Sequence, residues 1–196
     1  MITCVQITAA VLAVIFVMVL HELPKAIVYN ITSRKKESIA CIFHISRYID
    51  PIGMLFCIVV GAGFSKPYRY KIESKRQAFA IGLTGLCSLL LVFLIFMIIY
   101  SQCYTGLHMR EFIEEYDMFL QFSYWFIALV LLNSLGMFFV NLMPIATLDM
   151  GLIVASISLP TYIAMIRKDT EMKVVLWIVL VLQAIPIGVI KIVNLL

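Results

Sequence analysis

Long uninterrupted apolar runs are the feature that most constrains how this chain of 196 residues can fold. Three of them, residues 2–20, 78–100 and 119–140, reach the length of about 20 residues that a helix needs to cross a bilayer. The chain is 63% hydrophobic and only 13% charged, whereas a soluble domain is about half apolar and a quarter charged. The sequence therefore predicts an all-α polytopic membrane protein.

Three further apolar runs complete the expected architecture. Residues 174–193 form a fourth candidate span, interrupted only by Gln183 and, near its end, Lys191. Residues 52–64 and 151–166 are too short to cross a bilayer comfortably, so we expect re-entrant or buried segments there. With no internal repeat and no room for a soluble domain, residues 1–196 are expected to form a single membrane-embedded domain with about four spans.

The distribution of basic residues predicts which face of the membrane each loop occupies. Nine of the fifteen Lys and Arg residues lie between positions 34 and 76, on both sides of the short run 52–64. Because positively charged loops stay in the cytoplasm, this region is expected to be cytoplasmic and to contact anionic lipid headgroups. The acidic loop 101–118 is expected on the opposite face. The first and third spans then end at similar depth, which brings His21 and Glu22 towards Asp149.

Positions 21–25 read HELPK, which begins like the zinc-binding motif HExxH but has Lys25 in place of the second histidine. In that motif, two histidines one helical turn apart bind the metal and the glutamate acts as general base. A lysine ligates only when neutral, and its ammonium repels a metal ion. Of the other histidines, His44 lies on the predicted cytoplasmic side and is a candidate replacement ligand.

Three further stretches raise the significance of HELPK: RYIDPIGMLF (47–56), FSKPY (64–68) and NLMPIATLDMG (141–151). Together and in this order they resemble the short bacterial site-2 proteases, intramembrane zinc metalloproteases whose patterns run approximately HExxH, HIDPIG, WAKP and NxxPxxxLDG. The resemblance covers roughly positions 10–155. It implies a site-2 protease-like core in a multi-pass membrane protein of a bacterial plasma membrane.

The resemblance also implies roles for individual residues. His21 and Asp149 take the positions of zinc ligands, and Glu22 takes that of the catalytic base. Asn141 and Pro144 belong to the interruption of the helix that positions the aspartate. Lys66 and Pro67 take positions near a small sheet on the cytoplasmic side. Independently, Tyr68, Tyr70 and Ile72 alternate with basic residues, which predicts a half-buried strand. Such an edge could pair with an unwound substrate.

Several departures from the family pattern change the expected function. Besides Lys25, Tyr48 replaces the histidine of HIDPIG, Met150 follows the aspartate, and TGLCSL (84–89) stands where the family has AGPxxN. The favoured hypothesis is an inactive protease-like protein that binds or regulates a membrane-spanning protein segment, with no cofactor. The alternatives are an active zinc protease with an unusual ligand set and a small transporter or channel. No nucleic-acid partner is expected.

The charges also predict how the site is held together without a metal. Two carboxylates at membrane depth need a compensating cation, because an unpaired buried charge costs several kcal/mol. Lys25 lies one turn from His21 and Glu22 on the same helix. We therefore expect an ion pair between Lys25 and Asp149, shared with Glu22, that joins the first and third spans.

Overall fold

The structure is a computed structural model that describes residues 4–34, 42–66, 70–104 and 118–182. Its elements are helical. In chain order they are α1 (Cys4–Thr32), the 3₁₀ turn η1 (Ile45–Arg47), α3 (Pro51–Val60), α4 (Lys75–Tyr104), α6 (Met118–Asn141), α7 (Asp149–Ile157), α8 (Leu159–Arg167) and α9 (Asp169–Val181).

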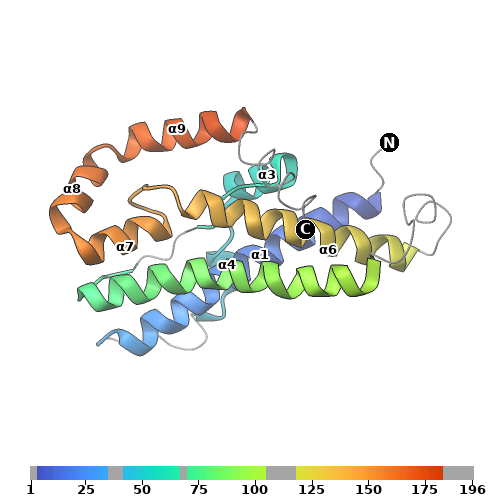
Figure 1. The fold of residues 1–196 in the computed structure, drawn as a ribbon, viewed down its shortest axis with the longest axis horizontal. Helices are drawn as coiled ribbons and strands as arrows, with labels where there is room; N and C mark the ends of the chain where they lie inside the picture. Colours follow the sequence, from blue (N-terminus) through green and yellow to red (C-terminus); the bar gives the residue numbers. More distant parts are fainter. Residues whose placement is uncertain (1–3, 35–41, 67–69, 105–117, 183–196) are drawn as a thin grey trace.

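Three helices, α1, α4 and α6, are long and apolar enough to cross a membrane. They lie side by side as a bundle, in which α1 and α6 run in one direction and α4 in the other (Figure 1). The end of α1, the start of α4 and the end of α6 therefore lie at the same end of the bundle. This supports the prediction of an all-α membrane protein, and the expected number of about four spans stays a prediction.

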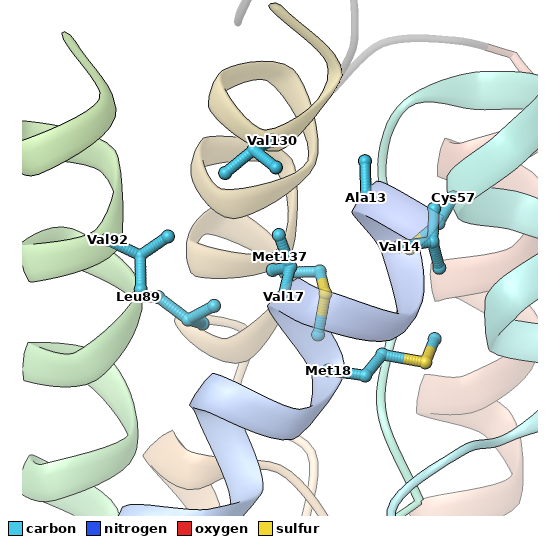
Figure 2. Close-up of a cluster of buried hydrophobic side chains, with 9 residues drawn as sticks. All are labelled: Ala13, Val14, Val17, Met18, Cys57, Leu89, Val92, Val130 and Met137. Atoms are coloured by element: carbon cyan, nitrogen blue, oxygen red, sulfur yellow. The ribbon is translucent and has the colours of Figure 1, made fainter. Parts of the chain in front are cut away.

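The centre of the bundle is an apolar cluster to which all three long helices contribute. Figure 2 shows side chains from α1, α4 and α6 converging there, together with Cys57 of α3. On α1 the buried residues recur every three or four positions, from Ala10 through Met18, because one face of a helix repeats with that period. The same buried face continues through the charged residues His21, Glu22 and Lys25.

The short apolar run 52–64 forms a short helix followed by a segment that runs back along it. Asp50 caps α3 by accepting hydrogen bonds from the backbone N–H groups of Ile52 and Gly53. Ten residues of helix rise about 15 Å, half the thickness of a bilayer core, so α3 is too short to cross. The chain turns at Gly61, where φ is +74°.

After Gly61 the chain runs back along α3. A Cβ atom at Gly53 would overlap the carbonyl of Phe64, so the returning segment packs directly against the helix at this point. The backbone N–H of Lys66 then donates to the carbonyl of Tyr48 at 3.1 Å, which joins the two ends of the excursion. This out-and-back path agrees with the predicted re-entrant course and delivers Ser65 to the side of α1.

An irregular segment between α6 and α7 positions Asp149. Asn141 ends α6 and its side chain donates to the carbonyl of Met137 at 2.9 Å, while Pro144 lies in the irregular segment that follows. Asp149 then begins α7, where a carboxylate is favoured by the helix dipole. The second short run, 151–166, is divided at Ser158 into α7 and α8, which meet at a sharp angle (Figure 1).

Three predictions about the elements need correction or stay open. The predicted small β element is wrong within the described residues, which contain no strand, and residues 70–74 are irregular chain. The helix that contains the first apolar run is longer than that run, because α1 continues through Pro24 to Thr32. The fourth predicted span lies partly in residues 183–196, outside the described residues, as do Pro67, Tyr68 and residues 105–117.

Candidate functional site: a buried ionic cluster

The four charged or polar residues singled out by the motifs meet in the interior. His21, Glu22, Lys25 and Asp149 are each at most 3% exposed, although Asp149 lies more than 120 positions along the chain from the other three. The buried face of α1 supplies three of these side chains, and the first turn of α7 supplies the fourth. The convergence expected from the order of the spans is therefore confirmed.

Lys25 lies between the two carboxylates. Its Nζ atom is 2.7 Å from Oε1 of Glu22 and 2.7 Å from Oδ1 of Asp149. These are charge-assisted contacts of short length, inside a region where Coulomb attraction is only weakly screened. The predicted ion pair of Lys25 with Asp149, shared with Glu22, is confirmed in geometry. It connects α1 to the short helix α7, not directly to the third long helix α6 as expected.

His21 joins the same cluster through both of its ring nitrogens. Nε2 is 2.7 Å from Oδ2 of Asp149, and Nδ1 is 2.8 Å from Oγ of Ser65. The Ser65 hydroxyl also donates to Oε1 of Glu22 at 2.6 Å. A closed ring of contacts therefore links His21, Ser65, Glu22, Lys25 and Asp149.

The electrostatics of the cluster keep Asp149 ionised. Burial alone would raise the pKa of this carboxyl, but the positive charge of Lys25, with a smaller contribution from the contact with His21, outweighs it, and the pKa falls to about 2. Burial and then the charges of Glu22 and Asp149 raise the pKa of Tyr70. Its hydroxyl therefore stays protonated and donates to Oε2 of Glu22 at 3.3 Å.

Two glycines of α4 make room for Asp149. A Cβ atom at Gly85 would overlap the Asp149 carboxylate, and one at Gly82 would crowd its backbone carbonyl. Gly85 belongs to the stretch TGLCSL, the part of the chain that matches the family's second-span pattern least well. The absence of a side chain at Gly85 therefore leaves the space that the Asp149 carboxylate occupies.

The remaining predicted residues are more dispersed. Lys66 is exposed. Tyr70, predicted at the substrate-binding edge, directs its hydroxyl to the buried Glu22. His44 is exposed, lies 3.2 Å from the hydroxyl of Ser46 and directly precedes the turn η1. It takes no part in the buried cluster described above.

The donor set does not fit the zinc site that the family resemblance implies. Catalytic zinc requires three protein ligands, and only His21 and Asp149 are ligands at the expected positions. The third position carries the ammonium group of Lys25, which already contacts both carboxylates. Among the described residues, no group of three or more His, Cys, Asp and Glu side chains is arranged to hold a metal ion.

Two cavities approach the cluster from different directions. The larger, of about 660 Å³, reaches Lys25 and Tyr70 and is walled by residues 72–75, the start of α4, α7 and α8; we call it the groove. The smaller, of about 220 Å³, reaches Ser65 between α3, the loop before α7 and α9. Thr147 lines both.

Comparison with known proteins adds no family assignment, since no protein-family model, no curated protein and no solved structure matches the chain. The residues themselves are thus the basis for any functional proposal.

Proposed function

We propose that this chain is a site-2 protease-like membrane protein that has exchanged zinc for Lys25 and that holds or regulates a membrane-spanning protein segment instead of cutting it with a metal. The observation that carries the proposal is the position of the Lys25 ammonium, 2.7 Å from Glu22 and 2.7 Å from Asp149. In a zinc protease these carboxylates would serve the metal and its water; here their charge is neutralised by a side chain.

The groove supports binding of an extended client segment. Residues 70–74 form one wall, and the N–H groups of Lys71 and Glu73 are occupied by Tyr29 and Gln77. The backbone of Ile72 makes no hydrogen bond to another described residue, so it offers a donor and an acceptor to a client.

Metal content tests the exchange of zinc for Lys25. We expect the wild type, purified in detergent and exposed to zinc, to retain no stoichiometric metal by atomic emission. Lys25→His restores a third ligand one turn from His21 and should bind one zinc per chain. The control Lys25→His/Asp149→Ala should lose it again. Stoichiometric zinc in the wild type that disappears in Asp149→Ala would overturn the proposal and favour the active zinc protease with an unusual ligand set.

Crosslinking tests the client site. A photoreactive residue at Ile72, in the groove, should crosslink a synthetic single-span peptide in micelles, and mass spectrometry should find the peptide intact. The matched control places the same residue at Ile98, which is 63% exposed on α4 and outside the groove. Equal crosslinking at the two positions, or cleavage of the peptide by a metal-loaded wild type, would contradict the proposal.

A further inference from the structure

Ser65 is the member of the cluster that neither zinc chemistry nor client binding explains. Its hydroxyl oxygen lies 2.8 Å from Nδ1 of His21 and 2.6 Å from Oε1 of Glu22. Ser65 occupies the position where the family pattern WAKP has alanine, so its hydroxyl is a second departure from the pattern, in addition to Lys25. Both departures contact Glu22 directly.

The contacts of Ser65 continue in series to a second carboxylate. His21 lies between Ser65 and Asp149, with one ring nitrogen 2.8 Å from the serine oxygen and the other 2.7 Å from Oδ2 of Asp149. A serine, a histidine and an aspartate linked in this order can transfer the serine proton to the histidine while the aspartate orients and stabilises the ring. Here Nδ1 faces the serine and Nε2 the aspartate, the reverse of the usual assignment, and Nδ1 also lies 3.3 Å from Oε1 of Glu22.

The smaller cavity provides a place for a substrate beside this serine. Ser65 lines it together with apolar side chains from α9 and the loop before α7, among them Leu148, Leu176 and Trp177. Thr147 and Lys173 also line the cavity and bring hydrogen-bond donors to it. A cavity of about 220 Å³ with mostly apolar walls and a few donors suits a short apolar acyl group with a carbonyl oxygen.

We propose that Ser65, His21 and Asp149 form a metal-independent acyl-transfer site for apolar carboxylic esters, with Ser65 as the nucleophile. Ser65 Oγ forms a bond to the ester carbonyl carbon, and His21 Nδ1 takes the hydroxyl proton. The bond from that carbon to the alcohol oxygen then breaks, and the alcohol leaves with the proton from His21. Water attacks the resulting acyl-serine in the same way, which releases the carboxylic acid and restores the serine.

This activity goes beyond the proposed function and does not rest on it. The client segment is expected in the larger groove, which reaches Lys25, whereas the ester is expected in the smaller cavity, which reaches Ser65. Lys25 lies beside both, because its ammonium is 2.7 Å from Glu22 and 2.7 Å from Asp149. The single hydroxyl proton of Ser65 points to Oε1 of Glu22 at 2.6 Å, so its transfer to His21 requires the hydroxyl to rotate towards Nδ1 at 2.8 Å. In the competing arrangement His21 is doubly protonated and donates to Ser65, and the serine is then a structural hydrogen-bond donor.

Covalent labelling and ester hydrolysis decide between the two arrangements. The folded wild type in detergent is treated with a small sulfonyl fluoride and, separately, with an alkyl fluorophosphonate, and the modified residue is located by fragmentation mass spectrometry. We expect an adduct on Ser65 and hydrolysis of p-nitrophenyl butyrate. Ser65→Ala, which has the residue of the family pattern, should lose the adduct and lower the hydrolysis rate more than about tenfold.

Ser156→Ala is the matched control, because Ser156 lies on α7 outside both cavities and bonds only to the carbonyl of Ile153 in its own helix. In this control, Ser65 should be modified and the ester hydrolysed as in the wild type. The unfolding midpoint of Ser65→Ala is measured to check that this variant folds. The proposal is overturned if neither reagent modifies Ser65, if Ser65 reacts only after heat unfolding, or if Ser65→Ala hydrolyses ester as fast as the wild type. None of these results alters the zinc content or the crosslink at Ile72, so the two proposals fail separately.

Discussion

The buried face of α1 holds two regions that stabilise the same bundle by different physics. From Ala10 to Met18 it is apolar and packs against α4, α6 and α3 (Figure 2). From His21 to Lys25 it is charged and packs against α7 and the segment that carries Ser65. Between helices in a bilayer the apolar half gains mainly close packing, since lipid tails are equally apolar. The charged residues require partners of opposite charge or hydrogen-bonding groups, so this half specifies that α7 and the segment carrying Ser65 pack against α1.

Among the changes considered, removing the Lys25 ammonium should lower the free energy of unfolding most. Lys25→Ala leaves Glu22 and Asp149 buried without a counter-charge, and breaking a buried pair in this way costs about 3–5 kcal/mol. Unfolding in mixed detergent micelles measures the loss. The control Lys75→Ala, on the exposed start of α4, should stay within about 0.5 kcal/mol of the wild type. A loss equal to that of the control would show that water or lipid headgroups already neutralise the carboxylates.

A deletion in the apolar half should cost less. Leu89 of α4 is fully buried in the cluster of Figure 2, and Leu89→Ala removes packing there. We expect a loss of about 2 kcal/mol, at the low end for buried leucines, because the bilayer reduces the hydrophobic part of the cost. Leu91→Ala, two residues further along and 59% exposed, should be close to neutral. A loss larger than that of Lys25→Ala would reverse the ranking of the two regions.

The close approach of α4 to Asp149 provides a third test. Alanine is favoured over glycine within a helix by about 1 kcal/mol, so Gly85→Ala should stabilise an unconstrained helix. Here the added methyl group overlaps the Asp149 carboxylate, and such overpacking costs about 1–3 kcal/mol. We expect a net loss of about 1 kcal/mol in the same unfolding assay. Thr84→Ala, the neighbouring change on α4, is the control, and a net gain from Gly85→Ala would place α7 further from α4.

The spans and the pairing of Lys25 with Asp149 could be predicted from the sequence because both follow from strong constraints. Twenty apolar residues have few alternatives to a spanning helix, and buried carboxylates require a cation. The sequence placed Lys25 on the same helix as His21, but not the end of that helix at Thr32. A proline removes one hydrogen bond, and residues 26–29 still have apolar side chains to bury. The predicted strand failed because alternation alone supplies no partner for the backbone.

Ser65 and Gly85 show where sequence reasoning reached its limit at the site. Serine is common near membranes, and nothing local distinguishes a serine that contacts two buried groups of a helix more than 40 positions earlier. The departure from WAKP to FSKP was the available signal, and it becomes informative only when the returning segment is seen beside α1. Gly85 was hidden for the same reason, because its importance depends on the carboxylate of another helix.

The outermost contact of the cluster should have the smallest effect. Tyr70 donates to Glu22 at 3.3 Å, a long hydrogen bond to a carboxylate that Lys25 and Ser65 already satisfy at 2.7 and 2.6 Å. Tyr70→Phe removes the hydroxyl but keeps the ring, whose centroid lies 5.2 Å from that of Tyr29. We therefore expect a loss of about 0.5–1 kcal/mol in the unfolding assay. Tyr162→Phe, which lines the same groove from α8, is the control and should change stability less. If Tyr70→Phe cost as much as Lys25→Ala, the boundary of the charged region would extend to the groove wall, and a client seated there would act directly on the stability of the cluster.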